Sequence, residues 1–277
     1  MYLKVAEENT NMINTVTINN MDEIFSLLKD YNYIPSLDRY RSPYLYRGLS
    51  NDDYSLETSL QRNSKNKQSF IEKNILRNFA KYVEICDVPL EKSIWRQMIL
   101  GQHHGLPTRL LDWSYSPLIG LNFAVSEDSP KELDKHDCIL WKINIEEINR
   151  LLPDKYRKIL QDENAIMFTV EMLEKHINTL DEFDGDIAKS AILLLEPPSL
   201  DQRIVNQYSY FSVIPLEMQN IEKFLNDNTN DTYKYIISKD LRWEIRDFLD
   251  QQNISERTMF PGLDGLSKWL KRYYYVK

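Results

Sequence analysis

The sequence QHHGLPTRLLDWSYSP occupies residues 102–117 and contains the end of one structural element and the start of two others. Gly105 is typical of a helix terminus, so a helix expected over residues 91–103 should end close to it. The apolar residues that follow predict a short strand over residues 108–113. The serine–proline pair at the end predicts a further helix, with Ser116 as its N-cap.

Apolar runs elsewhere in the chain predict further strands and helices. Short apolar or aromatic runs that end at turn-forming residues predict strands, and apolar residues at helical spacing predict helices. The strands are expected at residues 44–48, 138–145, 191–195, 208–214 and 233–237. The helices are expected at residues 21–29, 69–86, 164–180, 218–226, 239–251 and 264–274. Because strands and helices alternate without a regular βαβ order, we expect an α+β fold with a central mixed or antiparallel sheet flanked by helices.

Length and composition are those of a folded globular domain. The chain has 277 residues, of which 42% are hydrophobic and 27% are charged. This is enough apolar surface for a sizeable core, and we expect residues 1–277 to form a single α+β domain. The chain has seven glycines and no glycine-rich loop, which excludes the phosphate-binding loop and the Rossmann fingerprint.

The net charge restricts the classes of ligand. It is formally −8, which argues against broad binding of a phosphate backbone, because such binding depends on clustered lysine and arginine. A small basic pocket is still compatible with this charge. Arg47, Arg109 and Arg203 are the arginines from which we expect such a pocket to form.

Cysteine and histidine usage indicates neither a disulfide nor a metal site. Cys86 and Cys138 both lie in apolar runs and are expected to be buried, reduced thiols. No apolar stretch reaches the roughly 20 residues that span a bilayer, and the N-terminus does not resemble a signal peptide. We therefore expect a cytoplasmic protein without a membrane partner. The adjacent His103 and His104 point in different directions on a helix and cannot hold one metal together.

Tyr46-Arg47-Gly48 is the first of two candidate site segments. An arginine at the end of a strand can donate several hydrogen bonds to a phosphate or carboxylate group. The glycine allows a ligand to approach the backbone closely. The alternative is structural: an edge-strand arginine paired with an acidic neighbour, followed by a turn.

The second candidate segment is residues 102–114, where polar side chains interrupt an apolar strand. Burying Arg109 and Asp112 without partners would be costly, so they must pair with each other, with neighbours or with a ligand. A buried ion-pair network and a ligand site are both open. His103 is a candidate general base, and the alternative for it is a hydrogen-bonded position in the core.

These two segments resemble the bacterial FRG-domain family. The family name refers to an aromatic-Arg-Gly start, which Tyr46-Arg47-Gly48 matches, and the block at residues 102–113 with its following Ser-Pro helix continues the pattern. A Ser-Leu-x-Arg stretch at residues 59–62 and looser patterns around Arg203 and Gln207 also agree. The family's activity is undefined, so the resemblance alone names no function.

The resemblance also implies an organisation of the chain. It is strong over about residues 44–126 and looser over about residues 196–266. An FRG-like core is therefore expected at about residues 41–215, followed by a C-terminal strand–helix extension at residues 216–277.

A weaker similarity suggests an activity. ADP-ribosyltransferases of the arginine-serine-glutamate type begin their site with an aromatic-Arg-Gly strand, followed by a Ser-x-Ser strand end, which Ser114-Tyr115-Ser116 resembles. This similarity implies an enzyme that uses NAD, in which Arg47 holds the pyrophosphate or ribose and Ser114 holds the strand geometry. A carboxylate would stabilise the oxocarbenium-like transition state as nicotinamide leaves.

The candidate site residues fall into two groups. Those expected to bind NAD are Tyr46, Arg47, Gly48, Arg109, Ser114 and Arg203. Those expected to act in catalysis are Arg47, His103, Asp112, Glu196 and Gln207. No Glu-x-Glu motif occurs in the chain, so the glutamate of the transferase pattern has no direct counterpart. Glu196, Arg203 or Gln207 would occupy its place.

Three functions are open on these residues. The favoured one is an NAD-dependent ADP-ribosyltransferase-like enzyme, acting as a bacterial toxin or anti-phage effector on a protein or nucleic-acid acceptor. The missing Glu-x-Glu suggests a nucleotide- or partner-binding module without catalysis. The third is a metal-independent hydrolase or nuclease that uses His103 or His104. The sequence leaves the oligomeric state open.

Overall fold

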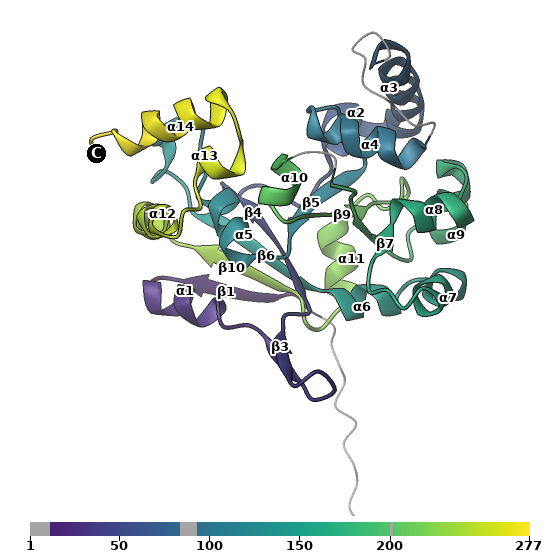
Figure 1. Cartoon of the computed structure of the whole chain (residues 1–277), viewed down its shortest axis with the longest axis horizontal. Helices are drawn as coiled ribbons and strands as arrows, with labels where there is room; N and C mark the ends of the chain where they lie inside the picture. The colour runs from purple at the N-terminus through teal and green to yellow at the C-terminus, as the bar shows by residue number, and fades with distance from the viewer. Residues whose placement is uncertain (1–11, 84–92, 200–201) are drawn as a thin grey trace, which may run out of the picture.

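Eight strands form one sheet in the computed structural model, which describes residues 12–83, 93–199 and 202–277 (Figure 1). Across the sheet the strands follow the order β1-β10-β6-β4-β5-β9-β8-β7. Their bounds are β1 Asn14–Ile18, β4 Tyr44–Leu49, β5 Leu110–Ser114, β6 Cys138–Asn144, β7 Phe168–Thr169, β8 Leu193–Glu196, β9 Ser209–Val213 and β10 Tyr233–Ile237. A separate hairpin consists of β2 Asn32–Ile34 and β3 Arg39–Arg41.

The sheet is mostly antiparallel. β1 runs parallel to β10 and β7 runs parallel to β8, so both outer pairs are parallel. The five pairings between them are antiparallel. The expected α+β fold with a mixed, mainly antiparallel sheet flanked by helices is confirmed.

The helices of the described residues lie against both faces of this sheet. Their bounds are α1 Met21–Leu27, α2 Ser59–Ser64, α3 Gln68–Val83, α4 Ile94–His103, α5 Pro117–Ala124, α6 Ile145–Arg150, α7 Asp154–Asp162, α8 Val170–His176, α9 Leu180–Ile187, α10 Gln202–Asn206, α11 Ile221–Asn228, α12 Arg242–Gln251, α13 Glu256–Met259 and α14 Leu263–Tyr273.

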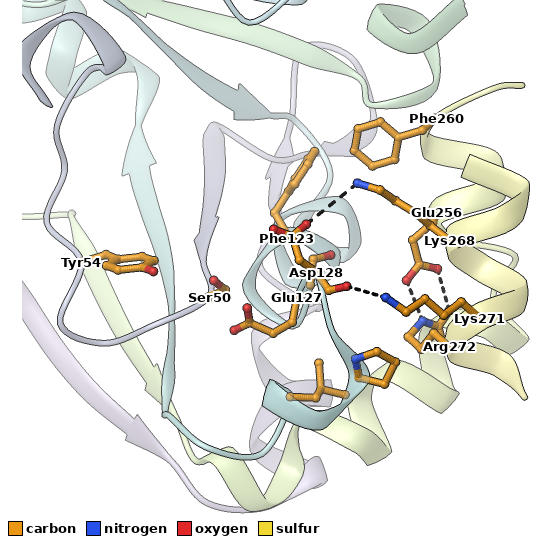
Figure 2. Close-up of a pocket in the computed structure, with 13 residues that line it drawn as sticks. Ser50, Tyr54, Phe123, Glu127, Asp128, Glu256, Phe260, Lys268, Lys271 and Arg272 are labelled. Carbon is orange, nitrogen blue, oxygen red and sulfur yellow. Dashed lines mark hydrogen bonds and ion pairs between the residues drawn. The ribbon is translucent and has the colours of Figure 1, made fainter. Parts of the chain in front are cut away.

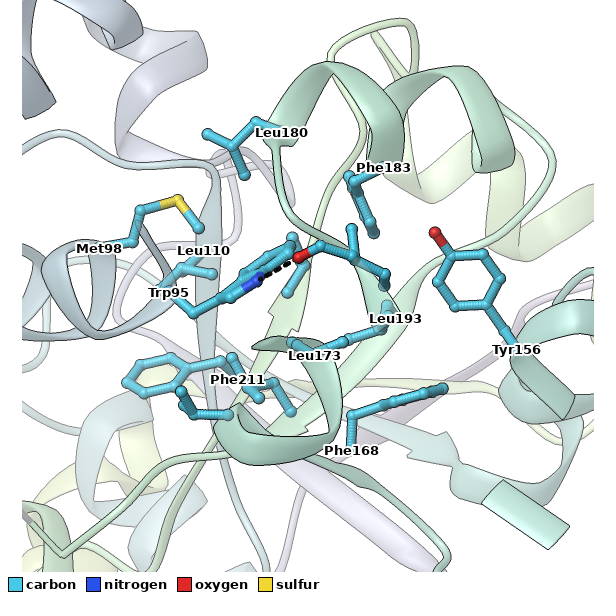
Figure 3. Packing of buried hydrophobic residues seen from close by; sticks show 14 of the residues in the cluster. Trp95, Met98, Leu110, Tyr156, Phe168, Leu173, Leu180, Phe183, Leu193 and Phe211 are labelled. Carbon is cyan, nitrogen blue, oxygen red and sulfur yellow. Dashed lines mark hydrogen bonds between the residues drawn. The ribbon is translucent and has the colours of Figure 1, made fainter. Parts of the chain in front are cut away.

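Alternation along the strands divides the buried side chains between the two faces. On one face, Leu110, Leu193 and Phe211 enter a core that α4, α8 and α9 cover (Figure 3). Further along the same face, Tyr46 and Leu140 enter a second core, to which α1, α5 and α12 contribute.

The opposite face of the sheet carries a third core. It contains Trp113 of β5 and Trp141 of β6, and α11 contributes Ile221, Phe224 and Leu225 to it. β6 is buried along almost its whole length because cores lie on both of its faces. This explains why its sequence is a nearly continuous apolar run.

The helix expected over residues 164–180 is wrong at both ends, because α8 covers only Val170–His176 and α9 begins at Leu180. Asn164 has a positive φ of 50° directly after α7, and Phe168 and Thr169 then pair in parallel with β8. α8 begins only at Val170, where the Thr169 hydroxyl accepts a hydrogen bond from the N–H of Met172 at 3.3 Å. Spacing alone could not reveal β7, because its partner strand is remote in the sequence.

Two smaller expectations are also resolved. α5 begins at Pro117 and Ser116 is its N-cap residue, as expected, although the Ser116 side chain makes no capping hydrogen bond. The Ser114 hydroxyl instead accepts the Ser116 N–H at 3.1 Å. Cys138 is a buried free thiol as expected, and burial raises its pKa to about 12, whereas Cys86 lies outside the described residues.

The expected C-terminal extension does not stand apart from the sheet. Its strand β10 lies between β1 and β6, pairing with both. The single-domain organisation of residues 1–277 stays a prediction.

Two glycines allow α5 to lie directly on β4. A Cβ atom at Gly48 would lie 2.2 Å from the backbone N of Ala124 and 2.2 Å from the carbonyl oxygen of Gly120. Conversely, a Cβ atom at Gly120 would lie 2.9 Å from the Cβ of Tyr46. The missing side chains therefore set the distance between helix and strand.

We expect Gly48→Ala to lower the free energy of unfolding by about 3 kcal/mol, because the added methyl group meets backbone atoms of a packed helix. Urea unfolding measures the change. Gly185→Ala, within α9, is the matched control, since its added Cβ would meet none of the described atoms within 4 Å. Alanine should stabilise that helix by up to about 1 kcal/mol. Equal effects of the two substitutions would contradict the tight contact between β4 and α5.

Candidate functional site

The sheet opens where β4 and β5 separate. Tyr46 and Ser114 are the one registered pair between these strands, whereas β4 shares six registered pairs with β6. A cavity of about 210 Å³ lies at this opening, and we call it the central cavity. It is lined by Tyr46, Arg47, Gly48, Gln102, Asp112, Trp113, Ser114, Phe123, Arg203, Gln207 and Ser209.

Most of the expected site residues meet in the central cavity. Those that line it are Tyr46, Arg47, Gly48, Asp112, Ser114, Arg203 and Gln207. Those that do not line it are His103, Arg109 and Glu196. The structure therefore brings these segments together at one cavity, and the roles of these side chains stay predictions.

Arg47 lies within β4 and lines the cavity, and the described residues use only part of its hydrogen-bonding capacity. Its Nη1 donates a hydrogen bond of 2.6 Å to the carbonyl oxygen of Asp112 and lies 3.6 Å from the Asp112 carboxylate. Its Nε is buried and has no hydrogen-bond partner among the described residues. Burial lowers the pKa of Arg47, and the nearby Asp112 carboxylate opposes that shift. A spare buried donor on a guanidinium is suited to an anionic group.

Asp112 is held by a short chain of hydrogen bonds. Gln102 Nε2 donates to Asp112 Oδ2 at 2.9 Å, and Thr108 Oγ1 donates to Gln102 Oε1 at 2.6 Å. The Thr108 hydroxyl also accepts the N–H of Leu110 at 3.1 Å. The Asp112 side chain is 52% exposed, so its carboxylate is fixed in direction while it still faces open space.

Ser114 uses both hydrogen-bonding functions of its hydroxyl on the backbone. Its Oγ donates to the carbonyl oxygen of Gln207 at 2.9 Å and accepts from Ser116 N–H at 3.1 Å. It therefore joins the end of β5 to the start of α5 and to the segment before β9. This geometry fits the structural role that we expected for Ser114.

Gln207 and Arg203 form the far wall of the cavity. Gln207 is buried, and its Nε2 donates to the carbonyl oxygen of Met259 at 3.0 Å. Arg203 Nη1 donates to the carbonyl oxygen of His103 at 3.2 Å, and the guanidinium lies 4.8 Å from the ring centre of Phe260. Both side chains therefore tie the cavity to the C-terminal part of the chain.

Arg109, which was expected to bind the cofactor, does not line the central cavity. It is 1% exposed, its Nε donates to Glu72 at 2.7 Å, and its Nη1 donates to Asp184 at 2.7 Å. Burial acts to lower the pKa of Arg109, but the bonds to these two carboxylates raise it overall. The expected cofactor-binding role is replaced by the ion-pair network that was its alternative.

Glu196 and His103 lie outside the central cavity. Glu196 is exposed at the end of β8, which β9 separates from β5. His103 ends α4 and lines a second cavity of about 830 Å³, which shares Arg203 with the central cavity. A catalytic role for either residue, and the hydrolase alternative that uses His103 or His104, stay predictions.

Four lining residues were not expected from the sequence. Gln102 and Trp113 belong to the quoted segment at residues 102–117, and their place there was the available signal. Phe123 and Ser209 reach the cavity from α5 and β9, and nothing in their local sequence marks them.

The part of the chain that supplies β4, β5 and α5 is similar to a known domain family. Residues 42–133 match the FRG domain. No curated protein and no solved structure matches the chain. The FRG segment, residues 42–133, contains Arg47, Asp112 and Ser114, whereas Arg203 and Gln207 lie beyond its end.

Among the described residues, no helix is both long and apolar enough to cross a membrane. Among the same residues, no three histidine, cysteine, aspartate or glutamate side chains gather as a metal ion would require.

We expect Arg109→Leu to lower the free energy of unfolding by about 3–5 kcal/mol, because it leaves Glu72 buried without its cation. Denaturant unfolding measures the loss. Lys155→Leu is the control, because Lys155 also contacts two carboxylates, Glu182 and Asp186, but is 45% exposed. Its removal should cost at most about 1 kcal/mol. Similar losses for the two variants would show that the Arg109 network is not a buried one.

Proposed function

We propose that this chain is an ADP-ribosyltransferase-like enzyme that binds NAD in the central cavity. The observation that carries the proposal is the meeting of Arg47 and Ser114 at the junction of β4 and β5. In the arginine-serine-glutamate pattern these two elements come from an aromatic-Arg-Gly strand and a Ser-x-Ser strand end. Here the residue before Arg47 pairs directly with Ser114.

The environment of Arg47 supports the proposal of a ligand that carries phosphate. Its side chain is 16% exposed, it faces the cavity, and one of its buried donors is unused by the described residues. Arg203 adds a second guanidinium to the same cavity. Two fork-shaped cations in an otherwise acidic chain favour an anion with several oxygens, such as the NAD pyrophosphate.

Asp112 is the one carboxylate among the residues that line the central cavity. In the proposed reaction the bond between the ribose C1′ and the nicotinamide nitrogen breaks, and its electron pair leaves with nicotinamide. The positive charge that develops on the ribose is stabilised by the Asp112 carboxylate, which Gln102 holds in place. The nucleophile of the acceptor then bonds to C1′ and loses its proton to Asp112 or to water.

A binding module without catalysis is the second candidate. In this candidate function Gln207, a neutral amide that lines the cavity, takes the place of the glutamate of the transferase pattern. The Asp112 carboxylate also lies 3.6 Å from Arg47 and accepts a bond from Gln102, so part of its charge is already compensated. Such a cavity could hold NAD without cleaving it.

The acceptor and the biological role belong to the same proposal and rest on the resemblance alone. We infer a protein or nucleic-acid acceptor and a role as a bacterial toxin or anti-phage effector.

The test measures NAD binding by calorimetry and nicotinamide release by chromatography. We expect Arg47→Lys to weaken NAD binding about tenfold or more, because lysine keeps the charge but loses the fork. Asp112→Asn should keep NAD binding within about twofold and slow nicotinamide release about 100-fold or more. Asp181→Asn, which changes an exposed aspartate on α9, is the control and should affect neither quantity.

The wild-type protein distinguishes the two candidate functions. If NAD binding depends on Arg47 and no nicotinamide is released, the binding module is the correct candidate and the enzyme is not. If the folded wild-type protein neither binds NAD nor releases nicotinamide, both candidates are wrong.

A further inference from the structure

The central cavity is too small for a whole dinucleotide. Its volume is about 210 Å³, whereas ligand sites commonly measure about 300–1,000 Å³. The second cavity, of about 830 Å³, adjoins it at Arg203. This second cavity is lined by His103, Gln202, Arg203, Phe260, Pro261, Asp264, Gly265, Ser267 and Lys268.

The second cavity has the two kinds of surface that a nucleotide needs. Phe260 and Pro261 provide an apolar wall against which a base can pack. Hydrogen-bond donors for phosphate and ribose oxygens come from Arg203, Lys268 and His103. The lining contains one carboxylate, that of Asp264. Because the chain as a whole carries a charge of −8, this local excess of cations favours an anionic ligand.

Lys268 is positioned to contribute to that excess. Its side chain is 67% exposed, and its Nζ lies 4.0 Å from the carboxylate of Asp128, which is itself fully exposed. Such a pair is weak, so a phosphate group can compete for the ammonium group. Figure 2 shows Lys268 and Lys271 projecting from the same helix, α14, toward Asp128. Lys271 Nζ donates a hydrogen bond of 3.2 Å to the carbonyl oxygen of Asp128.

A third cavity, of about 430 Å³, is less suited to the same ligand. It lies on the other side of Phe260, where Phe123 faces the Phe260 ring edge-on at 6.4 Å (Figure 2). It is lined by as many carboxylates as cations, namely Glu127, Asp128 and Glu256 against Lys268, Lys271 and Arg272. Arg272 is already bonded to Glu256 and Asp250, so this cavity offers little net positive charge.

We propose that the second cavity is the subsite for the adenylate half of the dinucleotide. This assignment rests on the proposed function for the central cavity. Arg203 lies at the border of the two cavities and contacts the pyrophosphate, while Lys268 contacts the phosphate on the adenosine side. Phe260 packs against the adenine. Nicotinamide mononucleotide, which lacks the adenylate, occupies the central cavity alone.

The test compares Lys268→Gln with Lys271→Gln, two neighbouring exposed lysines of α14 of which only Lys268 lines the second cavity. Calorimetry measures the binding of NAD, ADP-ribose and nicotinamide mononucleotide to each variant. We expect Lys268→Gln to weaken NAD and ADP-ribose about five- to tenfold and to leave nicotinamide mononucleotide unchanged. Lys271→Gln should leave all three affinities unchanged.

The outcomes separate this assignment from the proposed function. If NAD binds but both lysine variants bind it as the wild type does, the adenylate subsite is wrong while the central cavity stands. If ADP-ribose binds in a way that depends on Lys268 and nicotinamide is never released, the subsite stands and the enzymatic function fails. If neither NAD nor ADP-ribose binds the folded protein, both are overturned.

Discussion

The pairing of Tyr46 with Ser114 is the constraint on which the rest of the site depends. Among the described residues, it is the one registered strand pair between the half of the sheet that contains β1, β10, β6 and β4 and the half that contains β5, β9, β8 and β7. Because β4 continues past this pair along β6 alone, the side chain of Arg47 meets a cavity where a continuous sheet would place another strand. The Ser114 hydroxyl stabilises the junction by bonding to Gln207 and Ser116.

α14, which borders the second and third cavities, is anchored by buried polar contacts. α14 buries only Gly265 and Arg272, and Arg272 is bonded to Asp250 and Glu256 at distances of 2.6–2.8 Å. Arg246 of α12 is fully buried, which lowers its pKa to about 10, and it donates to Asn122 of α5 at 2.7 Å. Buried ion pairs contribute little net stability but fix geometry, so these contacts place α14 beside the cavities rather than bind it strongly there.

The sequence predicted six of the eight strands of the sheet, all except β1 and β7, and most of the cavity residues, but it could not predict the direction of every side chain. Arg109 directly precedes β5, and its guanidinium lies 5.9 Å from the ring centre of Phe183, in the core that also contains Leu110. Strand alternation therefore does not place the Arg109 side chain, which pairs with Glu72, whereas Asp112 within the strand lines the cavity. The position of Glu72 was not predictable, because it belongs to α3 and nothing local marks it as a partner.

The location of the FRG segment bears on what the site requires. Residues 42–133 supply β4, β5 and α5, but the neighbours of these strands in the sheet, β6 and β9, come from later in the chain. Arg203, Gln207 and Lys268 also lie beyond the segment. A protein with the same FRG segment and a different C-terminal part would keep Arg47 and Asp112 but change the far wall and the second cavity. The matched segment thus carries the junction, and under the proposed function the residues that follow it would set the ligand selectivity.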